Sequence, residues 1–303
     1  MSEDLLLAAQ NAHDRTRNWR LALGWRRWLV MLLLIGLIGI LWEASKALFG
    51  IPDYKLPHIT AILGEFGART QGGSGPIWAL LMLQNAGVTF GEALGGFVLG
   101  SLLGCMLAVL FIASPLLERG LLPYVVGSQL VPILAIAPMV VVGVGRIDPP
   151  AWLSESTQAT FNTFKTYFAK SLIATYLTFF PVTIGMLRGL RSVAPDALAL
   201  MRSYAASRWQ VFWKLRLPAS LPYLFTSLKV SATASIIGAI IGELPVGSSR
   251  GLGVVIVNAA QYYNSRPQNL WAAVLVASLL GLSFYGVVAL AERLIVRGRA
   301  INT

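Results

Sequence analysis

Few residues that could bind or guide a polar solute lie inside the apolar segments of this chain. Lys229 lies ten residues after Ala219 in one such run, which places it about 15 Å along a helix. A cation near the middle of a membrane costs at least about 2.5–3.5 kcal/mol unless it meets water or a partner. Lys229 therefore either lines the path of an anionic solute or pairs with an acid or with carbonyls as a packing contact.

Three other polar residues lie within or beside the apolar runs. Glu243, at the outer end of its run, is expected to be a gate or a structural hydrogen-bond acceptor rather than a substrate ligand. Glu92 begins another run and is expected at the membrane interface. Gln129 lies between Pro123 and Pro132, where a proline-distorted helix can free backbone carbonyls for a solute. The expected translocation path therefore contains Gln129, Lys229 and Glu243.

The residues that an enzyme or a metal site would need are nearly absent from the sequence. The single cysteine, Cys105, lies in an apolar run, and the two histidines, His13 and His58, are far apart. This excludes a disulfide framework and gives no metal-ligand spacing. No cluster of His, Cys or acidic residues is predicted at depth, and we find no acid in the central parts of the runs. We therefore expect no catalytic residue, no metal and no cofactor, and neither a membrane enzyme nor an ion-driven carrier is favoured.

The composition is that of a membrane protein. Of its 303 residues, 56% are hydrophobic and only 12% are charged, whereas a soluble domain has about 25% charged residues. The net charge of +11 does not indicate nucleic-acid binding, because the Lys and Arg residues lie between apolar runs. Those runs are continuous rather than alternating, which predicts helices and not membrane strands.

Six apolar segments predict an all-α, polytopic bundle of about six transmembrane helices. We expect residues 1–27 to form a cytoplasmic N-terminal tail, 28–297 the transmembrane domain and 298–303 a cytoplasmic C-terminal tail. The segments are approximately Trp28–Phe49, Val88–Ala113, Leu121–Gly145, Ala169–Arg188, Ala219–Ile241 and Asn269–Ala291.

Positive charge predicts the orientation. Cytoplasmic loops of membrane proteins are enriched in Lys and Arg. The two termini, the second loop and the loop between the fourth and fifth segments together carry 15 of these residues, and the opposite side carries 8. Both termini and the 189–218 loop are therefore expected in the cytoplasm. The tail charges are Arg15, Arg17, Arg20, Arg26 and Arg27 at one end and Arg293, Arg297 and Arg299 at the other.

Two long stretches fall on the opposite side. Residues 50–84 contain the run Gln71–Pro76, which is rich in glycine and predicts a linker or turn. Residues 146–168 carry aromatic side chains such as Trp152 and Phe164 among polar ones. This pattern favours an interfacial amphipathic helix, although a lid on a solute path would show the same pattern.

Residues 195–218 form a basic, aromatic-rich segment between two apolar runs. Pro195 suits the first turn of a helix that is predicted over Ala197–Ala206. Ser207 is a candidate N-cap for a second helix, Arg208–Leu217, which Pro218 is expected to end. The aromatic residues of the second helix are spaced so as to share one face. The segment could lie on the lipid surface or receive a soluble partner. The aromatic residues are Trp209, Phe212 and Trp213.

This segment resembles the cytoplasmic loop of ABC-importer permeases, whose pattern is Glu-Ala-Ala, three residues, Gly, nine residues, Ile, one residue and Leu-Pro. Leu217 and Pro218 match the end of the pattern. The triplet falls on residues 199–201, beginning at Ala199, and the glycine on Ala205, so both depart from the family. A glycine permits positive φ at a helix–helix turn, so alanine there costs about 1 kcal/mol or a changed turn.

Two other stretches resemble the nitrate, sulfonate, taurine and thiamine-precursor branch of these permeases, and the likeness covers about residues 85–297. They are Gln129–Met139, and Ser227–Ser231 with Gly242–Glu243 and Ser249–Gly253.

The resemblance implies a type I ABC importer permease of a bacterial inner membrane, which forms a pore with a second copy or a homologue. It implies that a cytosolic ABC ATPase dimer receives the cytoplasmic helix and that a periplasmic or lipid-anchored solute-binding protein delivers the solute. The residues expected to couple to the ATPase are Ala199, Ala205, Ser207, Arg208, Trp209, Phe212, Leu217 and Pro218. This chain has no Gly-x4-Gly-Lys-Ser/Thr loop for ATP.

Overall fold

The computed structural model describes residues 29–70, 73–150, 154–245 and 250–296, together with Arg26 and Trp152. The regular structure of these residues is helical, with one isolated β-bridge between Arg69 and Ile77, which confirms the all-α prediction. Two compact units divide between Gly64 and Glu65. The predicted tails, Arg26 excepted, and parts of the Gln71–Pro76 and Ser249–Gly253 stretches lie outside the described residues.

The number of predicted membrane spans is confirmed. Five described helices are long and apolar enough to cross a membrane, and a bent pair of helices supplies a sixth. The five are Leu29–Phe49, α3 (Trp78–Ala113), α6 (Glu155–Arg191), the helix Arg208–Glu243 and α11 (Pro267–Val296); the bent pair is α4 (Pro115–Ser128) with α5 (Ile133–Gly145).

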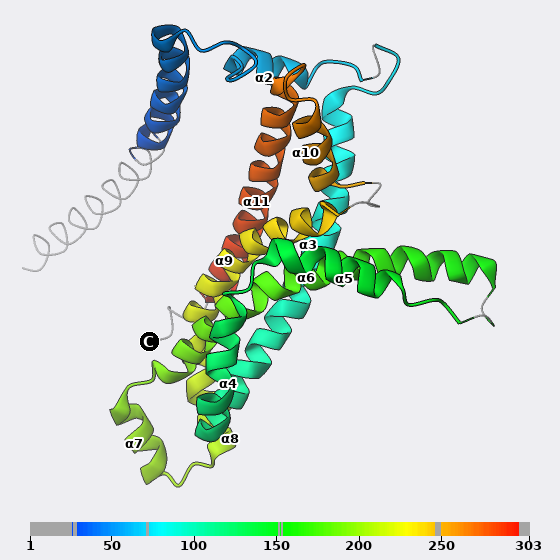
Figure 1. The fold of residues 1–303 in the computed structure, drawn as a ribbon. Coiled ribbons are helices and arrows are strands. Elements are labelled where there is room, and N and C mark those ends of the chain that lie inside the picture. Colours follow the sequence, from blue (N-terminus) through cyan, green and yellow to red (C-terminus); the bar gives the residue numbers. More distant parts are fainter. Residues whose placement is uncertain are drawn as a thin grey trace, which may run out of the picture. The chain divides into compact units, whose positions relative to one another are not determined.

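The third predicted span, Leu121–Gly145, is wrong as a single straight helix. It is broken between α4 and α5, whose axes differ by 96° (Figure 1). Pro132 lies at the start of α5 and has no N–H to donate, so α4 cannot continue through it. The carbonyl of Ser128, at the end of α4, accepts a hydrogen bond from the Tyr176 hydroxyl of α6 instead.

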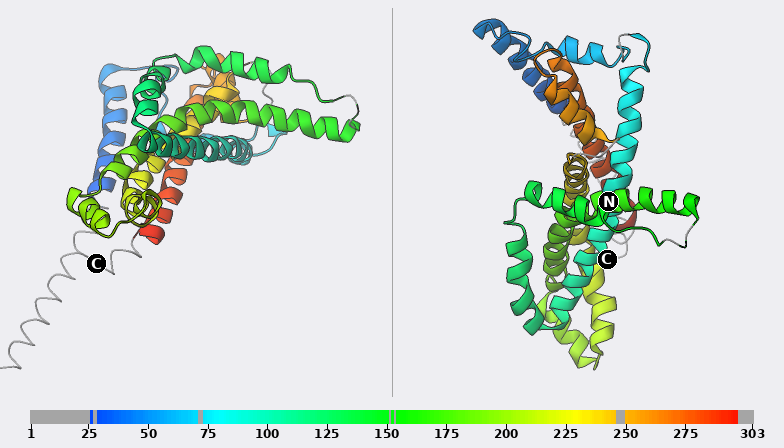
Figure 2. Two further views of the ribbon diagram at one scale, coloured as in Figure 1. Left: turned by 90° about the horizontal axis from the view of Figure 1, so that it is seen from below. Right: turned by 45° about the vertical axis from the view of Figure 1, so that its right-hand side comes forward.

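Helix α6 packs between α3 and the helix Arg208–Glu243 (Figures 1 and 2). Glycines four residues apart in α3 meet residues four apart in α6, so the two backbones come close together. A Cβ at Gly96 would lie 2.3 Å from Ala174 Cβ, and one at Gly100 would lie 2.6 Å from Thr178 Cβ. These glycines of α3 therefore allow close helix packing, whereas Gly91 has no neighbour within 4 Å.

Helix α6 is longer than its predicted span, Ala169–Arg188. It has 37 residues and begins at Glu155, so the predicted interfacial helix in the 146–168 stretch is its continuous N-terminal part. No proline or glycine interrupts it before Pro181. The Lys165 ammonium donates to the carbonyls of Gly145 and Ile147, at 3.0 Å each. These bonds satisfy carbonyls at the C-terminal end of α5.

The remaining labelled elements complete the larger unit. They are α7 (Pro195–Ser203), α8 (Arg208–Val211), the π-helix η2 (Phe212–Arg216), α9 (Leu217–Glu243) and α10 (Leu252–Gln261). The helix Arg208–Glu243 consists of α8, η2 and α9. The sequence did not predict α10, because its ten residues form an apolar run that is too short for a span.

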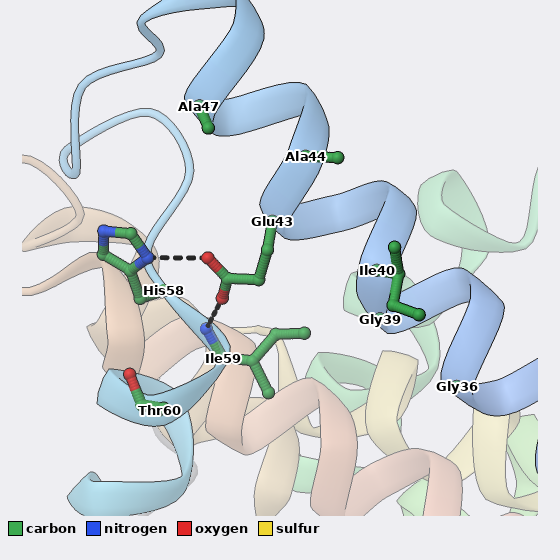
Figure 3. A pocket seen from close by; sticks show the side chains of 9 residues that line it. All are labelled: Gly36, Gly39, Ile40, Glu43, Ala44, Ala47, His58, Ile59 and Thr60. Carbon is green, nitrogen blue, oxygen red and sulfur yellow. Dashed lines mark hydrogen bonds and ion pairs between the residues drawn. The ribbon is translucent and has the colours of Figure 1, made fainter.

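The smaller unit contains the helix Leu29–Phe49, a turn and α2 (Ile59–Glu65). Glu43 fixes the turn: its carboxylate accepts the Ile59 N–H at 2.8 Å and lies 2.7 Å from His58 Nδ1 (Figure 3). Lys46 forms an ion pair with Asp53 of the turn. The Lys46 ammonium lowers the pKa of the Asp53 carboxyl, mainly through this hydrogen bond.

Candidate functional site

Helix α7 carries no buried residue, although five of its nine residues, at positions 197–201, are alanine, leucine or methionine. Pro195 and Asp196 occupy its first turn as predicted, and Arg202 lies in its last. Ala199, the first position of the expected triplet, is exposed. A helix with an exposed apolar side is suited to contact another surface.

The turn after α7 retains the geometry of the family glycine. Ala205 has φ +50°, the only positive φ of a non-glycine residue among those described. The Ala205 N–H donates to Arg202 O at 2.9 Å, and the Ala206 N–H to Met201 O at 3.0 Å. These two bonds define a Schellman motif. Helix α7 therefore ends at Ser203 rather than at the predicted Ala206, and the alanine tolerates a strained turn instead of changing it.

The second helix begins where the sequence predicts. Ser207 Oγ accepts the Gln210 N–H at 3.3 Å, and Gln210 Oε1 accepts the Ser207 N–H at 2.9 Å. This reciprocal pair is a capping box, which satisfies backbone donors at the start of α8. Arg208, the first residue of the helix, is exposed.

Pro218 does not end this helix, so that prediction is wrong. The five residues of η2 have π-helical hydrogen bonds, and the Leu217 N–H donates to Phe212 O, five residues back. Pro218 then falls in the first turn of α9, where a missing N–H is tolerated. The π turn offsets the proline, and the helix runs without a break from Arg208 to Glu243. The 195–218 segment is thus joined directly to a membrane-length helix.

The aromatic residues of the second helix do not all face the same environment. Phe212 is half-buried and packs on a core cluster with Phe111 and Leu190. Trp209 and Trp213 are exposed, 69% and 49% respectively. Their rings contact each other edge-to-face, with centroids 5.3 Å apart. Phe212 therefore anchors the helix, and the two tryptophans are left for a partner or a lipid surface.

The expected path residues lie in different surroundings and are not brought together. Gln129 caps the C-terminal end of α4 at the bend, and its amide nitrogen lies 3.3 Å from Ser128 Oγ. Lys229 Nζ lies 2.7 Å from Glu292 Oε2 of α11, with both side chains partly buried. This ion pair corresponds to the packing alternative for Lys229. Glu292 lies just beyond the predicted sixth span and is not among the residues expected from the sequence.

Glu243 is the centre of a buried polar cluster. Its Oε1 accepts a hydrogen bond from the Thr89 hydroxyl at 2.7 Å, and its Oε2 accepts one from the Gly253 N–H at 2.5 Å. Thr89 also accepts the Leu252 N–H at 2.9 Å, and Asn85 accepts the Gly251 N–H at 2.8 Å. Three successive N–H groups before and within α10 are thus held by side chains of α3 and α9. We call these residues, Asn85, Thr89, Glu243 and Gly251–Gly253, the Glu243 cluster.

Two positions of this cluster require glycine for steric reasons. Gly251 has φ +126°, which a side chain rarely permits. A Cβ at Gly251 would also lie 2.2 Å from the Glu243 carboxylate carbon, and one at Gly253 would lie 2.4 Å from Ile240 O. The Gly-Leu-Gly stretch therefore allows its backbone to approach Glu243 closely.

Glu92 lies beside this cluster and not at the interface, so its predicted position is wrong. It lies on the same face of α3 as Asn85 and Thr89, and it is fully buried. Its Oε1 is 2.7 Å from Lys170 Nζ of α6. Its Oε2 has no hydrogen-bond partner among the described residues. A lysine and two carboxylates are therefore buried together. Glu92 lies near the middle of α3, so the expectation of no acid in the central part of a span is wrong for this helix.

A spacing in the sequence could have revealed this arrangement. Asn85, Thr89 and Glu92 follow one another at intervals of four and three residues, which places them on one face of a helix. The predicted second span begins at Val88, which leaves Asn85 outside it and apart from the other two.

Comparison with known proteins gives the family. The model of the binding-protein-dependent transport system inner membrane component matches residues 96–297. That match covers most of the chain, from α3 through the 195–218 segment to the end of α11. The chain belongs to this family. It is a membrane permease of the ABC transporter class.

Individual relatives agree with this assignment. A "Probable ABC transporter permease protein" of Haemophilus influenzae is 30% identical over 86% of this chain and 93% of its own length. The riboflavin transport system permease protein of Chloroflexus aurantiacus is 29% identical over 87% of this chain and 88% of its own. The formylaminopyrimidine transport permease protein of Halalkalibacterium halodurans is 26% identical over 86% of this chain and 92% of its own length.

The branch that the sequence motifs indicated is confirmed as well. Permeases named for aliphatic sulfonates, taurine and nitrate are among the relatives of this permease. The names of these relatives cover chemically different solutes, so the family assignment does not select a substrate.

Proposed function

We propose that this permease is the transmembrane subunit of an ATP-driven ABC importer and moves a small polar organic solute or oxyanion by alternating access. The observation that carries the proposal is the 195–218 segment, in which two short helices meet at a left-handed turn. The second helix leaves Arg208 and Trp209 exposed. Exposed aromatic and arginine side chains are the groups that most often anchor protein interfaces.

The partners in this proposal are those of an importer. A cytosolic ABC ATPase dimer binds the 195–218 segment, a solute-binding protein delivers the solute on the other side, and a second permease copy or homologue completes the pore. The excess of positive charge supports a cytoplasmic position for this segment and both termini. The chain itself lacks a phosphate-binding loop, so ATP is bound by another subunit.

The continuous helix supports a mechanical link between the two sides. The α8–α9 helix begins at Arg208 within the segment and ends at Glu243, which holds the backbone of Gly253. A movement of the segment, driven by ATPase closure, would therefore be passed through one rigid element to the loop before α10. Residues at the two ends of such an element are displaced together.

A variant of the segment tests this proposal. Arg208→Glu with Trp209→Ala removes an aromatic anchor and reverses a charge. We expect ATP-dependent uptake and ATPase stimulation to fall by at least about tenfold, with membrane insertion unchanged. Phe212→Ala is not a suitable control because Phe212 is half-buried in the core; Lys214→Ala, at an exposed position of the same helix, is the matched control. Normal uptake and normal co-purification of the double variant with the ATPase would refute the coupling role.

The buried acids favour one second candidate, a carrier driven by a proton or sodium gradient. Glu92 and Glu243 are both buried in membrane-length helices, as ion sites of carriers are. Proteoliposomes separate the two proposals, because an importer requires ATP on the ATPase side and continues when a protonophore collapses the gradient. Uptake that follows the gradient without ATP would favour the carrier.

A further inference from the structure

A pocket of about 560 Å³ lies between the N-terminal half of α3 and α10. Small-molecule sites have typical volumes of about 300–1,000 Å³. Its polar lining consists of one guanidinium and three amides, and Val88 and Val255 are among the apolar residues of its wall. No acidic residue belongs to this lining. The polar residues are Gln84, Asn85, Arg250 and Asn258.

Three of these polar groups are available to a ligand. Arg250, Gln84 and Asn258 are exposed. Asn85 is not available, because its amide nitrogen donates to Leu81 O at 2.8 Å and its oxygen accepts the Gly251 N–H at 2.8 Å. The pocket thus offers one fixed positive charge and two neutral amides. A guanidinium forms paired hydrogen bonds with planar or tetrahedral oxyanions, and amide N–H groups can add to them.

The Glu243 cluster holds this pocket in shape. Arg250 directly precedes Gly251, whose N–H is bonded to Asn85. Glu243 lies behind Gly251, with its oxygens bonded to Thr89 and Gly253. The backbone that carries Arg250 is therefore fixed before any ligand arrives. Such preorganisation reduces the ordering cost of binding.

We propose that this pocket binds the anionic group of a small solute, a sulfonate or carboxylate, with Arg250 as its charged contact and with Gln84 and Asn258 as amide contacts. The proposal rests on the proposed import function and adds to it a place where the solute is held. A lipid headgroup has a similar phosphate oxyanion, so the test must separate a free anion from a lipid.

Charged thiol reagents can measure whether the pocket attracts anions. Asn258→Cys in a Cys105→Ala background places one thiol in the pocket, in the full-length permease in phosphatidylcholine nanodiscs. Anionic sulfonatoethyl methanethiosulfonate should react about tenfold faster than its cationic trimethylammonium analogue, because a positive site concentrates anions. Millimolar ethanesulfonate should slow this labelling, and Arg250→Gln should remove both effects. Ala260→Cys, two residues further along α10 and exposed, should show neither effect, and Arg266→Gln should leave both intact.

The opposite labelling results overturn the proposal. Equal reaction of the two reagents at position 258, or a preference that survives Arg250→Gln, means that Arg250 does not form an anion site. Protection by phosphatidylglycerol in the nanodiscs but not by ethanesulfonate means that the pocket holds a lipid. If Asn258→Cys does not insert into the membrane, Gln84→Cys reports on the same pocket from α3. None of these measurements depends on ATP, so ATP-driven uptake with a negative labelling result would reject this site and leave the proposed function in place.

Discussion

Thr89 and Glu243 are 154 residues apart in the chain, yet the Thr89 hydroxyl donates to the Glu243 carboxylate at 2.7 Å. The same hydroxyl oxygen accepts the Leu252 N–H at 2.9 Å. One threonine side chain therefore joins α3, α9 and α10, and its hydroxyl also lies 3.1 Å from the Asn85 carbonyl of its own helix.

Thr89→Val tests this relationship. The variant keeps the shape of the side chain but leaves the Leu252 N–H and one Glu243 oxygen without a partner, which costs about 1–3 kcal/mol. We expect hydrogen exchange at Leu252 to accelerate by about tenfold. Thr178→Val is the matched control, since Thr178 is equally buried but its hydroxyl has no partner among the described residues. Similar exchange rates at Leu252 in the two variants would show that the Thr89 hydrogen bonds do not stabilise the backbone there.

Ala205→Gly should stabilise the turn between α7 and α8. Ala205 has φ +50°, a conformation that costs an L-residue about 1 kcal/mol and glycine very little. Hydrogen exchange at the Ala206 amide, which donates to Met201 O, should slow by about fivefold. Ala206→Gly, at the next position, has no positive φ to relieve and should accelerate exchange or leave it unchanged. A faster exchange in Ala205→Gly would contradict the strained-turn interpretation.

The Lys229–Glu292 pair allows the two roles of Lys229 to be separated. If the pair is a packing contact, Lys229→Gln and Glu292→Gln should each lower stability by about 1–3 kcal/mol, and Lys229→Glu with Glu292→Lys should recover part of the loss. Thermal unfolding of the detergent-solubilised permease measures this. If Lys229 instead contacts an anionic solute, Lys229→Gln should keep its stability and lose uptake, while Glu292→Gln should not lose uptake.

The orientation is tested with single cysteines in a Cys105→Ala background. Ser203, at the end of α7, and Ser156, in the first turn of α6, are both exposed. The charge distribution predicts that Ser203 lies in the cytoplasm and Ser156 outside. An impermeant thiol reagent applied to intact cells should label Ser156→Cys at once and Ser203→Cys only after lysis. Labelling of Ser203→Cys from outside would exclude contact with a cytosolic ATPase.

Local signals in the sequence predicted much of the 195–218 segment. Ser207 is a strong N-cap and Pro195 a strong helix start, and both lie where expected. Pro218 misled the prediction, because the π turn that accommodates it depends on backbone bonds from Phe212 to Leu217 and has no simple residue signature.

The buried cluster was harder to predict from the sequence. Burial of Glu92 depends on its ion pair with Lys170, which lies 78 positions away. Burial of Glu243 depends on the Gly251–Gly253 backbone, which bonds to Glu243 and to side chains of α3. Such long-range contacts arise from tertiary packing, and no local sequence pattern predicts which partner a buried charge will have. The bend between α4 and α5 was missed for a similar reason: the prolines around Gln129 indicated distortion, but the 96° angle depends on how α6 receives the end of α4.

The glycine stripe of α3 also fixes the alignment of its helix pair. Gly96 and Gly100 fit against Ala174 and Thr178 almost backbone to backbone, so no bulky side chains are present that could exchange positions during a slide. A shift of one turn that brought Glu92 opposite Ala174 would also break its 2.7 Å contact with Lys170 and leave a carboxylate against apolar carbon. The α3–α6 pair therefore has a single register, and any change of shape in this permease must arise at other helix contacts.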